Sequence, residues 1–469
     1  MNTTSTDGQR MVVDTLISGA TIITMNETRQ IIRDGAVAIN DGLITAVGKA
    51  SDITKKYQSA DQVDGRNFVI TPGFVDGHVH ITGDPLTQGV RRGAPGEDFT
   101  DVLTKWVIPI FHSHEPKDEK ISAQCSAMRM LHSGVTTFVE AGTVRHLDAV
   151  AEGIESSGVR GRIGGWVEGR NFAANETDTA TIDEAIATLE SQSQKYKQTD
   201  TSRVAAWPLL IGHTVNPDEV WLAAKRLADE NGLCISAHMS PHQSDPDWFL
   251  ANTGKRPIEH LADIGVLGEN VMITHAAYVN EREVEILADT KTNVIFCPHA
   301  ALKGAFGVTS IGLFPEMAEA GVNIMLGTDG VLVDILTSAR LMTGLFKDAR
   351  VDEHVFPATE ALEMITLNGA RGVNMQSKLG AIEPGMKADL ACFDTDRPEW
   401  FPEFDVVEQI LQAPAGVGAH SVWVEGERVI DAYRSTRIDE EKLLADIRKS
   451  SAAIIERAGV KVHSPWPVI

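Results

Sequence analysis

The chain has 469 residues, which is long for one small domain and suits a barrel of about 250 to over 400 residues with an accessory module. Hydrophobic residues make up 43% and charged residues 23%, a composition typical of a globular protein with a large core. The formal net charge of −23 would repel phosphate backbones and anionic lipid, so nucleic-acid and membrane partners are disfavoured.

The N-terminus and the cysteines indicate a cellular setting. The first residues, MNTTSTDGQR, lack the apolar stretch of a signal peptide, and no segment has the roughly 18 uninterrupted apolar residues of a membrane span. Cys125, Cys234, Cys297 and Cys392 lie far apart and form no CxxC pair. We therefore expect a soluble protein in the reducing cytoplasm.

Both ends of the chain are rich in predicted β structure. From about Val12 to Val69 the sequence is short-period, alternating and rich in turns, as in DTLISGATIIT and GAVAINDGLITAVG. The same texture returns in KADLACFD and HSVWVEGERVI. The pattern predicts a small β-sandwich domain built from residues 1–70 and 385–435, followed over 436–469 by a helix and a Pro-rich tail.

The middle of the chain alternates short apolar runs with helical stretches, as an α/β protein does. Asn280 with Glu283 forms a capping-box pattern, and another helix is bounded by Asn216-Pro217 and Gly232. Eight βα repeats predict a (β/α)8 TIM barrel over residues 71–384. The apolar runs begin near Phe74, Thr136, Ile163, Ala206, Cys234, Val271, Val294 and Asn323.

The first apolar run ends in a pair of histidines. In extended backbone, His78 and His80 of PGFVDGHVHI point to the same side and can share one ion. An HxH pair alone is a weak signal, and two ordinary polar residues are its default interpretation. Its place at the end of an apolar run, directly after Thr71-Pro72-Gly73, favours a metal site instead.

Three later runs also end in metal-ligating residue types. LCISAHMS ends in His238, VMITHAAY in His275 and NIMLGTDG in Asp329. Each histidine alone could equally be structural, but side chains at the C-terminal ends of barrel strands converge on one mouth. The joint placement predicts a site for one divalent metal ion, for which Zn²⁺ is the first choice and Fe²⁺ or Mn²⁺ is acceptable.

The ordered motifs PGFVDGHVH, GVTTFVEAG, RPIEHLADIGVLGENVMITHAAYV, GTDG, ALEMITLNGARGV and GAIEPGMKADLACFD cover nearly the whole chain. Together they resemble the amidohydrolase superfamily, in particular its cytosine deaminase and triazine chlorohydrolase branch. The resemblance implies that His78, His80, His238 and Asp329 bind the metal. It also implies that His275 contacts the attacking water or the substrate. Because Asp329 would touch both the metal and the water, we expect it to act as the catalytic base that takes the proton of the water.

Binuclear relatives carry a bridging lysine at the end of strand four, whereas here that run reads AAWPLLIGH. A mononuclear site is therefore expected, and a dihydropyrimidinase-like activity is disfavoured. His213, at the end of this run, could line the pocket or serve as a structural histidine.

Two departures from the branch pattern bear on the substrate. Similar deaminases place a glutamate three residues after the strand-five histidine, where Pro241 stands here, and many place a histidine where Tyr278 stands. Without that acid, cleavage of an amide, carbamate or urea becomes the preferred prediction, because the metal can polarise a carbonyl oxygen directly. As a whole the chain looks most like the phenylurea hydrolases, which implies a role in herbicide degradation.

The alternative activity is deamination or dechlorination of a nitrogen heterocycle of the cytosine, triazine or guanine type. A scaffold without catalysis is the remaining reading, and the complete ligand set argues against it. A homo-oligomer acting on a small molecule is expected by resemblance only. The candidate substrate-facing residues are Tyr278, His242, His213 and His299, with the aromatic side chains of Phe306 and Trp106 as further candidates.

Overall fold

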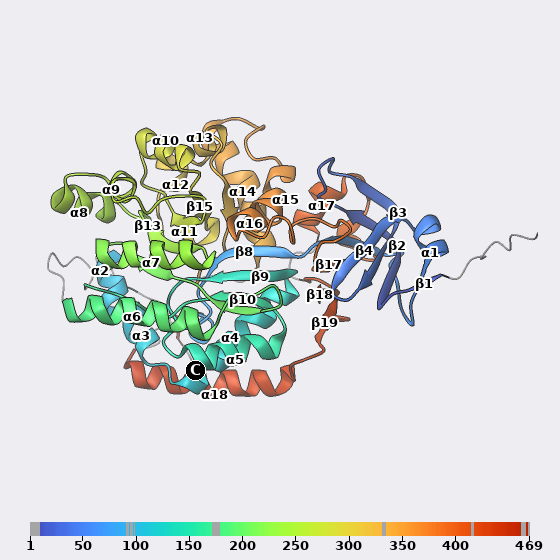
Figure 1. Cartoon of the computed structure of the whole chain (residues 1–469), viewed down its shortest axis with the longest axis horizontal. Helices are drawn as coiled ribbons and strands as arrows, with labels where there is room; N and C mark the ends of the chain where they lie inside the picture. The colour runs from blue at the N-terminus through green and yellow to red at the C-terminus, as the bar shows by residue number, and fades with distance from the viewer. Residues whose placement is uncertain are drawn as a thin grey trace, which may run out of the picture.

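The computed structural model describes residues 10–90, 93, 97, 99–170, 179–330, 334–413, 417–460 and 466–467. Two parallel sheets occupy the middle of the chain, which confirms the α/β class (Figure 1). The first sheet has the order β11-β10-β9-β8, with β8 (Phe74–Val79), β9 (Val135–Glu140), β10 (Arg160–Ile163) and β11 (Val204–Ala206). The second follows the order β12-β13-β14-β15-β16, with β12 (Leu209–Gly212), β13 (Ile235–Met239), β14 (Val271–His275), β15 (Asn293–Phe296) and β16 (Ile324–Leu326).

Two of these strands differ from the sequence prediction. The third run was placed from Ile163 onward, but β10 ends at that residue, because its sequence RGRI offers no apolar run to recognise. The fourth run is divided into β11 and β12 by Trp207-Pro208, since proline has no N–H to donate to a ladder. The remaining strands begin within one residue of their predicted starts.

Helices separate the strands and cover them. Those in the first half are α1 (Ala50–Lys56), α2 (Phe99–Val102), α3 (Ile108–His112), α4 (Pro116–His132), α5 (Leu147–Ser157), α6 (Thr179–Lys195), α7 (Asp218–Asn231), α8 (Ser244–Thr253) and α9 (Pro257–Asp263). Those in the second half are α10 (Glu281–Asp289), α11 (Pro298–Lys303), α12 (Val308–Ile311), α13 (Phe314–Glu319), α14 (Ile335–Arg350), α15 (Ala358–Ile365), α16 (Leu367–Gly372), α17 (Val406–Gln412) and α18 (Glu440–Ala458). A π-helix, Leu103–Val107, joins α2 to α3, and a 3₁₀ turn covers Pro398–Trp400.

The predicted helix boundaries at two caps are confirmed. The Asn280 side chain accepts from the backbone N–H of Glu283 and the Glu283 carboxylate accepts in return, which completes the capping box of α10. Helix α7 ends at Gly232 in the left-handed conformation, with φ 63°. These local sequences determine where α10 begins and where α7 ends. They thereby also determine the lengths of the connections to the neighbouring strands.

A nine-stranded sheet combines both ends of the chain, in the order β20-β19-β18-β17-β7-β2-β3-β4 with β6 paired to β2 (Figure 1). Strands β7 and β17 pair antiparallel, with Leu390 opposite Pro72. Because only Gly73 separates β7 from β8, the sheet leads directly into the first parallel strand. The strand bounds are β2 (Thr15–Ile23), β3 (Ile31–Asn40), β4 (Leu43–Lys49), β6 (Asp61–Asp64), β7 (Phe68–Pro72), β17 (Leu390–Asp394), β18 (Ser421–Val424), β19 (Glu427–Asp431) and β20 (Arg434–Ser435), while β1 (Met11–Val12) pairs with β5 (Tyr57–Gln58).

The ends of the chain bear on several further predictions. Helix α18 agrees with the predicted C-terminal helix and packs along α4 (Figure 1). All four cysteines are buried free thiols. Within the described residues, no helix is both long and apolar enough to cross a membrane. The predicted domain and tail segments that fall on residues 1–9, 461–465 and 468–469 lie outside the described residues, and the cytoplasmic setting stays a prediction.

Candidate metal centre and cavity

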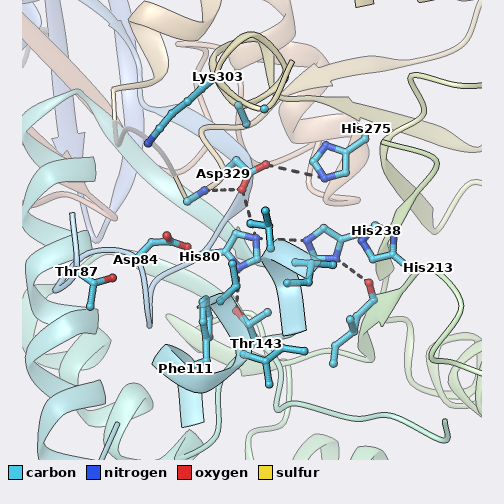
Figure 2. Close-up of a pocket in the computed structure, with 18 of the residues that line it drawn as sticks. His80, Asp84, Thr87, Phe111, Thr143, His213, His238, His275, Lys303 and Asp329 are labelled. Carbon is cyan, nitrogen blue, oxygen red and sulfur yellow. Dashed lines mark hydrogen bonds and ion pairs between the residues drawn. The ribbon is translucent and has the colours of Figure 1, made fainter. Parts of the chain in front are cut away.

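The five side chains predicted at strand ends lie together in the structure. Figure 2 shows four of them, His80, His238, His275 and Asp329. His78 lies on β8 and His80 directly follows it, His238 lies on β13 and His275 is the last residue of β14. Asp329 follows β16 by three residues, and its backbone N–H donates to the carbonyl oxygen of His78 at 2.8 Å. Ligand atoms of these residues lie within 4.8 Å of one another in groups of three that could hold a metal ion.

The separations between ligand atoms suit a tetrahedral ion. His80 Nε2 is 3.4 Å from His238 Nε2 and 3.4 Å from Asp329 Oδ1. Two atoms each about 2.1 Å from a tetrahedral zinc ion would stand about 3.4 Å apart. His78 Nε2 is buried and has no hydrogen-bond partner among the described residues, as a ligand nitrogen awaiting a cation would be. The donor set therefore fits one zinc-type ion.

Hydrogen bonds outside the centre orient two of the imidazoles (Figure 2). His238 Nδ1 lies 2.8 Å from the carbonyl oxygen of Ile211, which can only accept, so the proton is on Nδ1 and the Nε2 lone pair faces the centre. His80 Nδ1 lies 3.1 Å from Thr143 Oγ1, and that hydroxyl donates to Glu140 Oε1 at 2.7 Å. The Thr143 oxygen is thereby left to accept from His80, which presents Nε2 in the same way.

Burial favours the neutral form of the histidines, which is the form that binds metals. Burial and the neighbouring histidines hold the pKa of His78 and of His238 well below the ordinary value. The same causes lower the pKa of His275. Three imidazoles are therefore free of a competing proton at neutral pH.

A third grouping, made of His275, Cys297 and Asp329, is chemically less suitable. Burial and the nearby Asp329 and Asp76 raise the pKa of the Cys297 thiol well above its ordinary value. Because a thiol must lose its proton to ligate a metal, Cys297 stays a packing residue. The predicted set of histidines with Asp329 is the better centre.

A cavity of about 660 Å³ opens beside these side chains and is lined by His80, His238, His275 and Asp329 (Figure 2). This volume lies within the range of small-molecule sites. One wall is apolar and comes from the segment 102–111 together with Trp166, Ile211 and Phe306. The charged side chains of Asp84, Glu97 and Lys303 also line the cavity.

His213 faces this cavity and is held by a carboxylate. Its Nδ1 lies 2.8 Å from Asp245 Oδ2, which also accepts the backbone N–H of Ser240 at 2.8 Å. The His213 ring stacks on His238 with centroids 5.3 Å apart. Of the two roles left open by the sequence, the geometry favours pocket lining.

The other predicted substrate-facing residues lie at different depths. His242 and Phe306 line the cavity, with their rings 4.6 Å apart. Among the described residues, Tyr278 and His299 are not part of the lining, and Tyr278 stands behind His242 at a centroid distance of 6.5 Å. Trp106 is also behind the wall, where its indole N–H donates to Glu97 at 2.8 Å. Direct substrate contact by Tyr278, His299 or Trp106 is thus not supported.

Strained backbone accompanies the site. Left-handed φ angles occur at His213 (49°), Ser240 (54°), His275 (80°) and Asp329 (59°), all at or just after strand ends. Non-glycine residues rarely adopt this conformation, and such strain concentrates at functional sites. Three of these four residues, His213, His275 and Asp329, line the cavity.

Sequence reasoning missed several residues of the site. Glu140 is the last residue of β9 and belongs to the quoted motif GVTTFVEAG, and Thr143 directly follows that motif, so a strand-end search could have found both. Asp245 could not be found, because it lies within α8 and only the fold brings it to His213. Nor does any local pattern show that Asp84 and Lys303 meet across one cavity.

Comparison with known proteins places this chain in a family. Residues 69–429 match the amidohydrolase family. A 5-methylthioadenosine/S-adenosylhomocysteine deaminase of Pelotomaculum thermopropionicum is 27% identical over 446 residues, covering 94% of this chain and 99% of the relative. A 5'-deoxyadenosine deaminase of Methanosarcina acetivorans is 26% identical over 455 residues, covering 95% and 100%.

Solved structures share the fold. An adenosine deaminase from Xanthomonas campestris with bound zinc has a TM-score of 0.85 and 23% identity, and the match covers 96% of this chain and 100% of that one. An atrazine chlorohydrolase from Arthrobacter aurescens, complexed with zinc, has a TM-score of 0.82 and 20% identity, with coverage of 94% and 100%. The triazine and deaminase resemblance agrees with these neighbours, whereas none of these relatives is a phenylurea hydrolase.

Proposed function

This chain belongs to the amidohydrolase family of metal-dependent hydrolases that act on carbon–nitrogen bonds, and from that premise we propose that it deaminates an aminated nitrogen heterocycle of the adenine-nucleoside type. The observation that carries the proposal is the convergence of four histidines and Asp329 beside a cavity of about 660 Å³. Relatives that match along almost the whole chain are deaminases of adenosine compounds. The deaminase alternative thus has more support than the aryl-urea prediction.

In this proposal His78, His80, His238 and Asp329 hold one zinc ion. The 3.4 Å separations of His80 Nε2 from its neighbours and the orphaned His78 Nε2 support this set. A bound zinc ion would act as a Lewis acid and bring the pKa of a water molecule from about 15.7 to about 7. Fe²⁺ or Mn²⁺ would meet the same nitrogen and oxygen ligands.

The protein's own side chains then handle the proton. Asp329 stands between His80 and His275, at 3.4 Å and 3.9 Å from their Nε2 atoms, where its carboxylate can accept a proton from the attacking water. His275, neutral because of burial, is placed to donate a hydrogen bond to the group at the attacked carbon. The apolar wall of segment 102–111 would exclude bulk water and stack on a planar ring.

A second candidate function, cleavage of an aryl urea, amide or carbamate, rests on one observation. Position 241 is proline, so the carboxylic acid that would protonate a ring nitrogen is missing there. A urea, amide or carbamate would not need a protein carboxylic acid to protonate a ring nitrogen. The apolar wall, with Phe111 and Trp166, would suit an aryl group equally well.

We also propose that the two parallel sheets form one (β/α)8 barrel. Strands β11 and β12 would be one strand broken at Pro208, and the seam between β8 and β16 would be closed by the backbone hydrogen bond from Asp329 to His78. The nine-stranded sheet would then be the small β-sandwich domain. The domain limits 1–70, 71–384, 385–435 and 436–469, and assembly into a homo-oligomer, stay predictions.

The test is a substrate panel on zinc-loaded protein, with the released amine identified. Adenosine, 5'-deoxyadenosine and 5-methylthioadenosine should release ammonia, while a dimethylphenylurea and an anilide report the second candidate by releasing an aromatic amine. Ammonia from a heterocycle supports the deaminase. Aromatic amine as the sole product would reverse the ranking, and no product from any compound would contradict both functions. Chelated protein is the control for metal dependence.

A further inference from the structure

A second pocket lies away from the metal centre and gathers cations. Its volume is about 170 Å³. Arg160 and Arg162 of β10 form one side, and Lys378 and Lys387, from the segment between α16 and β17, form another. Asp200 is the sole carboxylate among the described residues that line it. Nothing in the proposed hydrolysis uses these residues.

Three of these cations already have a carboxylate. Arg160 forms a two-pronged pair with Asp389 at 2.5 Å and 3.2 Å. Lys387 contacts Glu425, and Lys378 lies 2.5 Å from Asp200. These three carboxylates around the pocket are therefore already paired with a cation.

Arg162 differs from these three cations in its partners. It is buried, with only 1% of its surface exposed. Within the described part of the chain it forms no ion pair, and its guanidinium is met by the carbonyl oxygens of Gly161 and Arg203, both at 3.3 Å, and by Met375 Sδ at 3.4 Å. Its Nε is buried without any hydrogen-bond partner among the described residues. The ring of Trp207 is a further neighbour, and its centroid is 5.6 Å from Cζ.

Such an arrangement is costly unless an anion completes it. A buried charge without a counter-ion loses hydration that carbonyl dipoles replace only in part. The same environment lowers the pKa of Arg162 to about 9, first through burial and then through Arg160. Arginine nevertheless keeps its proton at neutral pH, so the positive charge persists.

We propose that this pocket binds a small oxyanion of the phosphate or sulfate class, with Arg162 and Lys387 at its floor and Lys378 at its mouth. A guanidinium offers a fork of N–H donors that matches tetrahedral oxyanions, and lysine adds a point charge. Lys387 is 9% exposed and the Lys378 side chain 41% exposed, so the site has a buried end and an open end. The volume suits a free oxyanion with few waters better than a whole nucleotide.

The bound anion would join two parts of the molecule, because Arg162 lies on a parallel strand and Lys387 lies just before β17 of the nine-stranded sheet. We therefore expect phosphate to raise the thermal midpoint of the zinc-loaded protein in a saturable way, at constant ionic strength. Titration calorimetry should find one phosphate per chain at this site. Adenosine monophosphate, tested in parallel, distinguishes a free oxyanion from the phosphate of a nucleotide.

The variant that tests the proposal is Arg162→Met, which keeps the length and removes the charge. It should bind phosphate at least tenfold more weakly. In phosphate-free buffer its thermal midpoint should equal or exceed that of the parent, because an unpaired buried charge has been removed. Since phosphate could also reach the metal centre, titrations of zinc-loaded and chelated protein are compared, and binding at the metal would survive in this variant.

Lys378→Gln, at the exposed mouth, keeps the test decisive if the buried variant folds poorly. It should weaken phosphate binding several-fold. Arg226→Met is the matched control, since Arg226 is exposed, pairs with Glu190 and lies outside the pocket lining. Absence of saturable binding in the parent, or unchanged phosphate affinity in both Arg162→Met and Lys378→Gln, would overturn the proposal, as would equal weakening by Arg226→Met.

Discussion

Three histidines of the proposed metal centre, His78, His80 and His238, each contact an oxygen atom outside it. A carbonyl oxygen fixes His238, and a hydroxyl that itself donates to Glu140 fixes His80. His78 Nδ1 lies 3.2 Å from Thr274 Oγ1. Such outer hydrogen bonds set the tautomer and make a ligand more basic.

Asp329 carries the sharpest residue-scale prediction. Asp329→Asn should retain part of the zinc but lose turnover by at least about a thousandfold, because an amide can ligate weakly and cannot accept the proton. The two measurements are the zinc content, by mass spectrometry, and kcat on the substrate that the panel identifies. Asp334→Asn is the control, since asparagine caps α14 as well as aspartate does. Near-normal kcat in Asp329→Asn would refute its role as base.

Glu140 predicts a pH effect on stability. Burial raises its pKa to about 8 from an ordinary 4.5. Between these values the folded chain holds a proton that the unfolded chain has released, so this group lowers stability as the pH rises through the window, by about 1.4 kcal/mol per pH unit. Glu140→Gln should therefore flatten the fall in unfolding free energy from pH 5 to pH 8.

Chemical denaturation at several pH values measures that slope. Chelated protein is used for all variants, because Glu140 accepts from the Thr143 hydroxyl that contacts His80, and metal binding would add its own pH dependence. Glu152→Gln is the control, because Glu152 is exposed and pairs with Lys120 on the surface. An identical slope in the parent and Glu140→Gln would show that Glu140 is ionised in the folded protein throughout this range.

The metal-centre side chains were accessible to sequence reasoning because each lies at or just after a strand end. Apolar runs mark the strands, and the residue that ends each run is visible without knowing the fold. Arg160 and Arg162 show the limit of this method. They are both 1% exposed, yet a strand that buries charge has no apolar run, so β10 was misplaced by its sequence.

At the scale of elements, the approach of β12 to β13 depends on one glycine. Gly212 has φ +74°, and a Cβ there would overlap the carbonyl oxygen of His238. Its N–H donates to Asn216 at 2.7 Å, which holds the turn after β12. Any larger residue would push β13 outward and move the His238 imidazole from its place.

Gly212→Ala should therefore lower the unfolding free energy by more than the roughly 1–2 kcal/mol of a left-handed alanine alone, and should weaken zinc binding. Gly232→Ala is matched to it, because Gly232 also has a positive φ of 63° but faces open space. Denaturation and zinc affinity are measured for both variants. Equal losses in the two would mean that backbone conformation, and not crowding at His238, sets the effect.

At the scale of the molecule, ion pairs connect the nine-stranded sheet to the parallel strands, and one of these pairs, Arg160 with Asp389, is buried. Arg160 of β10 reaches Asp389, which precedes β17, and Asp389 also accepts the backbone N–H of Glu425 at 2.9 Å. Arg203, just before β11, lies 2.8 Å from Glu427 of β19. The sequence predicted that both termini contribute one small β domain, but pairs more than two hundred residues apart left no local pattern.

Asp389→Asn tests how strongly this junction holds. Although burial raises the pKa of Asp389, the Arg160 guanidinium outweighs it and keeps the pKa below the ordinary value, so the carboxylate contributes stability at neutral pH that is lost as the pH falls through that lowered pKa. Removing one partner of a buried pair should cost about 3–5 kcal/mol of unfolding free energy.

The double variant Arg160→Met with Asp389→Leu should recover most of that loss, because it removes both charges of the pair. Asp394→Asn, further along β17 and partly exposed, should change the unfolding free energy by less than about 1 kcal/mol. Denaturant titration at neutral pH gives all three values. If Asp389→Asn were as mild as Asp394→Asn, the junction would be held by apolar packing, and the Arg160–Asp389 pair would only fix the register of β10 against β17.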